Sequence, residues 1–226
     1  MEATKEFIDY ILEPIKALVT EAASNVKEIY NCNDDLVTLI KEDGSPVTEA
    51  DKKSNDIIIE TLKALTPEIQ IISEETYSKN NIHKYEDLFW LIDPLDGTKE
   101  FINKTGEFTI NIALISKNKP VFGVVSAPIS GQIWTGSIFD KKLASKKLVS
   151  KKLRIVSSRN HITKNDKKLF GYLDERNIAF ELVEKGSSIK ICNLADNIAD
   201  IYPRFGPTSE WDIAAAHAVL LSSGGS

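Results

Sequence analysis

The sequence is poor in the residues that build thiolate metal sites and disulfide frameworks. It has two cysteines, Cys32 and Cys192, which lie far apart, and three scattered histidines, His83, His161 and His217. None of them has a cysteine or histidine partner at the spacing of a zinc site, and two distant cysteines make no disulfide framework. The sequence therefore predicts a fold that depends on its hydrophobic core.

A long apolar run and an excess of basic residues are also missing. No stretch is long and apolar enough for a transmembrane segment, and no signal peptide is recognisable, so we expect a cytoplasmic protein. The 28 basic and 33 acidic residues give a formal net charge of -5, which argues against a nucleic-acid polymer or an anionic membrane as partner. Small molecules are the expected partners, and a chain of 226 residues can bury one sizeable core or two modest ones.

One local exception is the segment 141–154, in which Lys-Lys-Leu occurs three times at five-residue spacing. It lacks interleaved aromatic residues, and a spacing of five fits neither a helix nor a strand, so we expect a solvated loop or hairpin. Loose peripheral membrane association through this segment stays open, as does the choice between a monomer and a homodimer.

Carboxylates at the end of an apolar run dominate the rest of the sequence. Residues 88–92 predict a buried strand that ends in Asp93-Pro94-Leu95-Asp96-Gly97-Thr98. Pro94 fixes a backbone dihedral, and Gly97 lets the backbone approach a ligand closely. Carboxylates, a carbonyl and N–H groups on one turn suit Mg²⁺ with a substrate phosphate. The competing interpretation is a plain Asx-type turn.

Two more acidic residues are predicted at element boundaries. Thr48 and Asp51 have the spacing of a helix cap and its third residue, and residues 69–72 predict a strand that leads into Glu74. If that strand lies parallel to the one before Asp93, both carboxylates reach the same sheet edge. The alternatives are a purely structural cap for Asp51 and a solvated loop for Glu74.

The remaining segments alternate between helix and strand patterns. A helix is expected over residues 4–30, with Pro14 kinking it or dividing it into two helices. The other expected elements are antiparallel strands over 108–116, 120–127 and 132–138, a strand over 153–157, a helix over 163–175, a strand over 178–183, and helices over 189–195 and from Asp212 to Leu221. Gly186, Ser187 and Ser188 precede one helix, where N–H groups and Lys190 would face an anion.

Five acidic residues thus lie at element boundaries: Asp51, Glu74, Asp93, Asp96 and Asp212. Clustered acids repel one another unless cations lie between them. Two or more Mg²⁺ ions would compensate this charge and support phosphoryl transfer, with Gly97 and Thr98 providing N–H groups for a phosphate. Helix-dipole stabilisation is the alternative explanation for Asp212.

Four motifs in order resemble the inositol monophosphatase family of Mg²⁺-dependent, lithium-sensitive phosphatases. They are Pro46-Val47-Thr48-Glu49-Ala50-Asp51, Ser73-Glu74-Glu75, the turn from Asp93 to Thr98, and Trp211-Asp212-Ile213-Ala214-Ala215. Four further stretches resemble its 3'(2'),5'-bisphosphate nucleotidase branch of the CysQ type: Lys99–Phe101, Gly106–Asn111, Gly186–Lys190 and Tyr202–Thr208.

The resemblance implies the layered αβαβα fold of that family and a hydrolase that converts adenosine 3',5'-bisphosphate to AMP and phosphate, a step that clears a by-product of sulfate assimilation. It implies one Mg²⁺ held by Glu74, Asp93 and the Leu95 carbonyl, and a second held by Asp93, Asp96 and Asp212. A third ion stays open.

By the same resemblance, Asp51 and Thr98 orient and deprotonate the attacking water, with Glu74 as a further catalytic residue. Substrate contacts are implied for Glu74, Leu95, Asp96, Gly97, Thr98, Asp212, Ser187, Ser188, Lys190, Arg204 and the stretch Ser157 to His161.

The resemblance also implies one catalytic unit with an N-terminal metal-binding half, residues 1–152, and a C-terminal α/β half, residues 153–226. Family members continue for a few tens of residues with terminal strands beyond the position of Ser226, so part of the substrate wall is expected to be missing. An inositol monophosphatase or sugar phosphatase on the same site, and a non-catalytic nucleotide- or metal-binding regulator, stay as alternatives.

Overall fold

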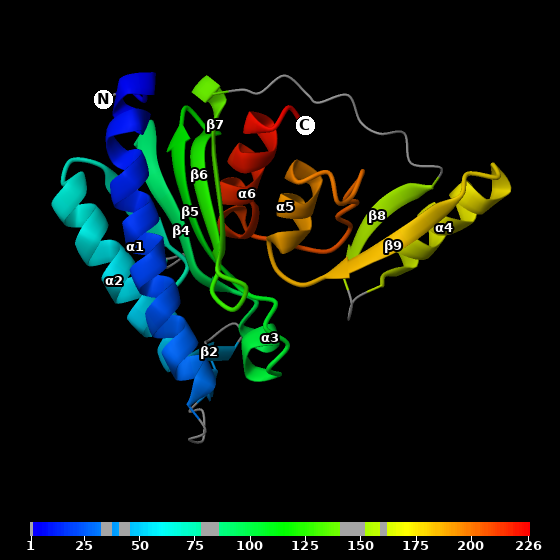
Figure 1. Cartoon of the computed structure of the whole chain (residues 1–226), viewed down its shortest axis with the longest axis horizontal. Coiled ribbons are helices and arrows are strands. Elements are labelled where there is room, and N and C mark those ends of the chain that lie inside the picture. Colours follow the sequence, from blue (N-terminus) through cyan, green and yellow to red (C-terminus); the bar gives the residue numbers. More distant parts are fainter. Residues whose placement is uncertain (1, 33–37, 41–45, 78–85, 141–151, 159–161) are drawn as a thin grey trace.

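The fold consists of stacked layers of helices and sheets. The computed structural model describes residues 2–32, 38–40, 46–77, 86–140, 152–158 and 162–226. In Figure 1, helices α1 (Lys5–Asn31) and α2 (Glu49–Leu65) cover one face of a five-stranded sheet, and α5 (Ile189–Ala195) and α6 (Glu210–Ser222) lie on its other side. Beyond them lie a two-stranded sheet and α4 (Lys164–Glu175). This order confirms the αβαβα sandwich predicted from the sequence.

The central sheet brings the predicted strand ends together. Its order is β3-β4-β5-β6-β7, with β3 parallel to β4 and every other neighbouring pair antiparallel. The strands are β3 (Gln70–Ser73), β4 (Leu88–Asp96), β5 (Thr109–Ser116), β6 (Lys119–Ala127) and β7 (Gln132–Ser137). The parallel pairing of β3 with β4 is the arrangement that the sequence required for Glu74 to emerge beside Asp93.

The β4 strand is longer than predicted, because it continues through Pro94 to Asp96. Its register with β5 shifts between Asp93 and Asp96, which is a bulge in the ladder. Pro94 lies inside this bulge, where no N–H is needed for the ladder. The bulge therefore ends the regular pairing at the point where the carboxylates begin.

The first helix excludes one of the two alternatives predicted at Pro14, a division into two helices, whereas a kink there stays a prediction. α1 is a single helix with Pro14 inside it, not two consecutive helices. The apolar face is buried on both sides of the proline, at Ile8, Ile11, Ile15 and Leu18. Burial of this continuous face outweighs the loss of one backbone hydrogen bond at the proline.

Close packing against the sheet fixes the position of α6. An added Cβ at Gly123 of β6 would lie 2.2 Å from the Ala215 carbonyl oxygen, and one at Gly136 of β7 would lie 2.5 Å from the Val219 Cα. Only glycine allows the helix backbone to come this near. The N-terminal end of α6, which carries Asp212, is thereby held at the sheet.

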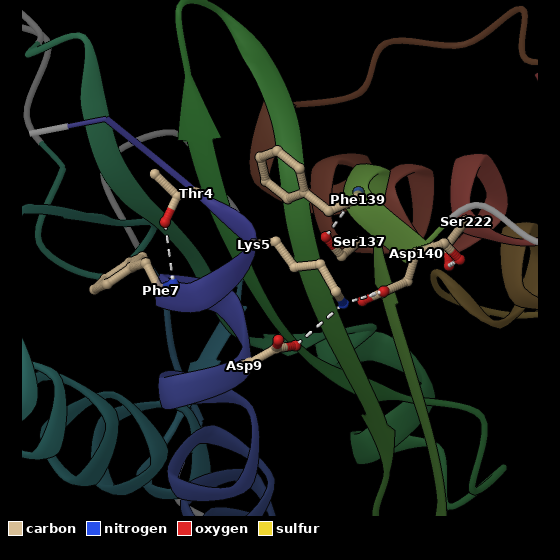
Figure 2. A network of polar contacts seen from close by, with 8 residues as sticks. All are labelled: Thr4, Lys5, Phe7, Asp9, Ser137, Phe139, Asp140 and Ser222. Carbon is tan, nitrogen blue, oxygen red and sulfur yellow. Dashed lines mark hydrogen bonds and ion pairs between the residues drawn. The ribbon is translucent and has the colours of Figure 1, made fainter.

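The edge of this assembly carries a small polar network. Lys5 of α1 reaches Asp140, in the 3-10 helix η1 (Ile138–Asp140), with 2.5 Å between Nζ and Oδ1, and it also contacts Asp9 (Figure 2). The Ser222 hydroxyl at the end of α6 donates to the Asp140 carbonyl oxygen at 3.4 Å. Both side chains of the Lys5–Asp140 ion pair are half exposed, so the pair contributes little to the free energy of unfolding.

The second sheet consists of β8 (Leu153–Ser158) and β9 (Phe180–Lys185), which are parallel, and Ile201 adds an isolated bridge to β8. Phe180 stacks on Phe170 of α4, with ring centroids 5.3 Å apart. The predicted strand over 178–183 therefore begins two residues later. The division of the chain at residue 152 stays a prediction.

The remaining predicted elements agree with the structure in type. A capping box joins Thr48 to Asp51, as the spacing indicated, and a second one joins Thr163 to Asp166 at the start of α4. The short remaining elements are β1 (Thr38–Ile40), β2 (Pro46–Thr48) and α3 (Thr98–Ile102). The Lys-Lys-Leu segment lies outside the described residues except for its last few positions.

Candidate metal and phosphate site

Three carboxylates from three different elements meet at the end of the central sheet. Glu74 follows β3, Asp93 lies in β4 and Asp212 lies in the first turn of α6. One ligand oxygen from each residue lies within 4.8 Å of the other two. The Glu74 N–H donates to the Ile92 carbonyl oxygen at 3.1 Å, which keeps Glu74 beside β4 after its own strand has ended.

Asp93 is the most deeply buried member of this group, with 1% of its surface exposed. Its Oδ1 accepts a hydrogen bond from the Leu95 N–H at 3.1 Å. Burial raises the pKa of Asp93 well above its ordinary value, and the neighbouring charges of Asp96, Glu74 and Asp212 raise it further. Among the described residues, like charges therefore dominate the surroundings of Asp93.

Asp212 is oriented by the start of its own helix. Its Oδ2 accepts hydrogen bonds from the Ser209 N–H at 3.0 Å and from the Thr208 hydroxyl at 2.8 Å. The contact with the Ser209 N–H belongs to a capping box at the start of α6, which is a structural role for this carboxylate, whereas helix-dipole stabilisation stays a prediction. One ligand oxygen of Asp212 also lies within 4.8 Å of those of Glu74 and Asp93, so a structural role does not exclude a role at the site.

Asp96 lies against the turn that joins β9 to α5. Its Oδ2 accepts from the Ser187 hydroxyl at 2.7 Å and from the Ser188 N–H at 2.6 Å. Burial raises the pKa of Asp96 to about 6, the charge of Asp212 adds to this, and the bond from Ser187 opposes it. Asp96 thus connects the carboxylate group to a segment 91 residues further along the chain.

Asp51 and Thr98 form a pair on the other side of the turn. The Thr98 hydroxyl donates to Asp51 Oδ1 at 3.1 Å, and Asp51 Oδ2 accepts from the backbone N–H and hydroxyl of Thr48. Burial raises the pKa of Asp51, and these hydrogen bonds partly oppose the rise. One carboxylate therefore caps α2 and also holds a hydroxyl at the site.

The turn itself depends on a glycine. Gly97 has a φ of +94°, a conformation that other residues rarely adopt, and it directly precedes Thr98 at the start of α3. This bend lets the chain pass from β4 into α3 within one residue. The Leu95 carbonyl oxygen remains beside Thr98, 3.4 Å from its hydroxyl oxygen.

A cavity of about 480 Å³ opens over these residues. Apart from the stretch Ser157 to His161, its lining includes every sequence-predicted substrate and metal residue: Glu74, Asp93, Leu95, Asp96, Gly97, Thr98, Ser187, Ser188, Lys190, Arg204 and Asp212. Asp51 is not among the lining residues, but it accepts a hydrogen bond from the lining residue Thr98. From the predicted stretch Ser157 to His161, Ser158 lines the cavity, and residues 159–161 lie outside the described part of the chain.

Two basic residues, Lys190 and Arg204, line the same cavity as the carboxylates. Lys190 is buried, and that burial lowers the pKa of its ammonium group, whereas the charge of Asp96 raises it. Arg204 donates to the Tyr202 hydroxyl at 3.2 Å and to the Pro207 carbonyl oxygen at 2.8 Å. Sequence reasoning missed Tyr202 as a lining residue, although its neighbour Arg204 was a candidate.

Three residues near the start of β5 were also missed. Thr109 and Asn111 contact the Ser187–Ser188 turn, and Glu107 contacts Gly186. The available signal was the polar side chain at positions 109 and 111 of an otherwise apolar strand. Polar residues that alternate along a buried strand need partners, and here the partners come from a distant segment.

The residues present fit a divalent metal ion. Carboxylate and carbonyl oxygens are the ligands that hard cations prefer, and three carboxylates converge within 4.8 Å. Asn111, which is paired with Asp93 across the strands, is 1% exposed, and its Nδ2 has no hydrogen-bond partner among the described residues. A bound cation would compensate the negative charge of the three carboxylates. An oxygen atom that ligates this cation could accept a hydrogen bond from Asn111 Nδ2.

No described helix is both long and apolar enough to cross a bilayer.

The sequence profile of the inositol monophosphatase family matches residues 8–226. The 3'(2'),5'-bisphosphate nucleotidases CysQ of Salmonella typhimurium and Escherichia coli (strain K12) are 39% and 36% identical over 222 residues, which is 95% of this chain and 88% of each relative.

Solved structures agree with these relatives. CysQ from Bacteroides thetaiotaomicron has a TM-score of 0.78 at 31% identity, covering 92% of this chain and 84% of that one. The extragenic suppressor protein suhB from Bartonella henselae has a TM-score of 0.80 at 21% identity, covering 95% and 85%, and it supports the fold alone. The chain therefore belongs to the inositol monophosphatase family, whose members depend on metal ions.

Proposed function

We propose that the protein is a Mg²⁺-dependent 3'(2'),5'-bisphosphate nucleotidase that hydrolyses adenosine 3',5'-bisphosphate to AMP and phosphate. The observation that carries this proposal is the convergence of Glu74, Asp93 and Asp212 beside a cavity that also holds Lys190 and Arg204. The two nucleotidase relatives, at 39% and 36% identity, support the choice of substrate. A cytoplasmic location, lithium sensitivity and a place in sulfur metabolism belong to the same proposal.

In this proposal, Glu74, Asp93 and the Leu95 carbonyl hold one Mg²⁺, and Asp93, Asp96 and Asp212 hold a second. When bound, the ions supply Lewis-acid activation of water and stabilise the charge that develops on the phosphate oxygens. Asp93 would be the shared ligand, because the charges of Asp96, Glu74 and Asp212 all act on its carboxylate.

Thr98 and Asp51 act on the attacking water. Because the Thr98 hydroxyl donates its hydrogen to Asp51, its lone pairs are available to accept a hydrogen bond from water. As the water attacks phosphorus, its proton passes to Thr98, and the threonine proton passes to Asp51. The burial that raises the pKa of Asp51 favours its role as the final proton acceptor.

The basic side of the cavity suits the second phosphate of a bisphosphate substrate. Lys190 and Arg204 both line the cavity, and both contact Tyr202, Lys190 over its ring and Arg204 at its hydroxyl. A volume of about 480 Å³ falls in the range of nucleotide-sized sites. A monophosphate would leave this basic side without an anion.

The test is a phosphate-release assay on a small panel with Mg²⁺. The panel comprises adenosine 3',5'-bisphosphate, its 5'-phosphosulfate relative, inositol 1-phosphate and fructose 1,6-bisphosphate, each also measured with EDTA. The expected result is the highest kcat/KM for the adenosine bisphosphate and loss of all activity with EDTA.

Two outcomes would contradict the proposal in different ways. A higher kcat/KM for inositol 1-phosphate or fructose 1,6-bisphosphate would replace the nucleotide by an inositol or sugar phosphate on the same site. Calorimetric binding of the nucleotide with no turnover under any divalent cation would identify a non-catalytic regulator.

A further inference from the structure

A partly buried carboxylate outside the proposed metal ligands holds the β9–α5 turn against the central sheet. Glu107, which lies just before β5, accepts a hydrogen bond at Oε2 from the Gly186 N–H at 2.9 Å. Its Oε1 accepts another from Lys185 Nζ at 3.1 Å. The Glu107 side chain is 14% exposed and that of Lys185 is 39% exposed, so the backbone contact is the better shielded of the two.

The contact between these segments is close enough to require glycine. An added Cβ at Gly186 would lie 2.8 Å from the Glu107 carbonyl oxygen and 3.0 Å from Cγ of Glu100. Real Cβ atoms do not approach a backbone oxygen to 2.8 Å without movement of one segment. Gly186 therefore fixes how near the turn lies to the residues before β5.

The same turn supplies both hydrogen bonds that the structure shows on Asp96. Ser187 donates through its hydroxyl and Ser188 through its N–H, both to Asp96 Oδ2. Ser187 has a φ of +54°, a conformation that costs free energy for a residue other than glycine and persists only where the surroundings impose it. The turn is therefore held in place by its contacts rather than by its own preference.

Those contacts come from three successive odd positions of one segment. Glu107 binds Gly186, and the Thr109 hydroxyl lies 2.5 Å from the Ser187 hydroxyl and 2.8 Å from the Ser188 hydroxyl. Asn111 Oδ1 accepts from the Ser188 hydroxyl at 2.8 Å. Residues 107, 109 and 111 thus form one row of polar side chains that contacts each residue of the turn from Gly186 to Ser188.

We propose that Glu107 is a positioning residue of the metal centre: by holding Gly186 it sets the two donors that orient Asp96. This inference rests on the proposed metal site. Loss of the Glu107 carboxylate leaves a shielded N–H without its acceptor, and the turn can then move away from Asp96. Residues that orient metal ligands typically change metal affinity by 10- to 100-fold when they are removed.

The experiment measures Mg²⁺ binding by calorimetry and phosphate release over a range of Mg²⁺ concentrations. Glu107→Ala is expected to weaken Mg²⁺ binding about tenfold, while kcat at saturating Mg²⁺ stays within about twofold of wild type. Glu107→Gln keeps an oxygen for the Gly186 N–H, so it is expected to restore Mg²⁺ binding to within about twofold. The matched control is Glu184→Ala, which removes an exposed carboxylate from the residue next to Lys185.

A second variant covers the case in which Glu107→Ala does not fold. Gly186→Ala keeps every charge but pushes the turn off Glu107, so it is expected to weaken Mg²⁺ binding in the same direction. Circular dichroism and thermal unfolding without Mg²⁺ establish that each variant is folded at the temperature of the titration.

Three results would overturn the proposal. Unchanged Mg²⁺ affinity in folded Glu107→Ala, with or without a lower Tm, would leave Glu107 a purely structural role. An equal loss in Glu184→Ala would assign the effect to net charge. A wild-type protein that binds no Mg²⁺ would remove both the proposed function and this inference, whereas the first two results leave the proposed function intact.

Discussion

The central sheet and the small second sheet hold their parts of the site by different means. Asp93 lies in a strand paired on both sides, next to Ile92 in the core, so the backbone ladder and the core fix it. The Ser187–Ser188 turn follows a two-stranded sheet in which Leu182 is 37% exposed, and polar side-chain contacts hold it. We infer that changes in the first region act on the chemistry and changes in the second act on ligand affinity.

The largest expected effect is that of Asp93→Asn, which tests the first half of this comparison. Because Asp93 is the proposed shared ligand, activity should fall by at least ~1000-fold, equivalent to ~4 kcal/mol. Mg²⁺ binding measured by calorimetry should be lost. The metal-free variant should unfold at a higher temperature than wild type, because a buried charge has been removed. Retained turnover would eliminate the two-metal assignment.

Thr98→Val separates the reaction step from metal binding. It removes the hydroxyl that contacts Asp51 while keeping the shape of the side chain, so kcat should fall about 100-fold. Mg²⁺ affinity should stay near that of wild type. Thr98→Ser is the matched control and should keep most of the activity. An equal loss in both variants would place the effect in packing rather than in proton transfer.

Gly123→Ala tests how strongly the position of α6 depends on close packing. The new methyl would lie 2.2 Å from the Ala215 carbonyl oxygen, so the free energy of unfolding should fall by about 3 kcal/mol. Gly171→Ala in α4 is the comparison from the second region. No atom lies within 4 Å of its added Cβ, and the variant should gain about 0.5–1 kcal/mol in chemical denaturation. Similar losses in both would contradict the contrast between the regions.

Asp96→Asn links the two regions through pH. The pKa of Asp96 is about 6 in the folded protein and 3.8 ordinarily, so between these values the folded state binds more protons than the unfolded state. Stability of the metal-free protein should therefore fall as pH rises from about 4 to 6. Because the raised pKa values of Asp93 and Asp51 also contribute to this slope, the variant should lose only the share due to Asp96, and it should gain ~3 kcal/mol above pH 6 in EDTA, measured by urea unfolding. An unchanged slope would exclude Asp96 as its source.

The smallest effect is expected for Lys190→Met on the basic side of the cavity. KM for adenosine 3',5'-bisphosphate should rise about tenfold, whereas KM for adenosine 3'-monophosphate should change little, because the monophosphate lacks the second anion. Steady-state kinetics on the two substrates measure this difference. Equal increases for both would assign Lys190 to the scissile phosphate or to Asp96.

Much of the local structure could be predicted from the sequence, because it depends on neighbouring residues. The Thr48–Asp51 capping box is an interaction over three residues, and the strands that precede Glu74 and Asp93 appear as short apolar runs. The strand length at Pro94 and the continuity of α1 through Pro14 could not be predicted in this way, since burial against other elements decides both.

The sequence alone determined which acidic residues stand at element boundaries and which motifs connect the chain to its family. Only the tertiary structure decided that Glu107, Thr109 and Asn111 form hydrogen bonds with the β9–α5 turn, which lies about 80 residues after them in the chain. The same turn donates hydrogen bonds to Asp96. The physical reason is that a cap or a strand end depends on local spacing, whereas contacts between distant segments depend on how closely two backbones pack, here at Gly186.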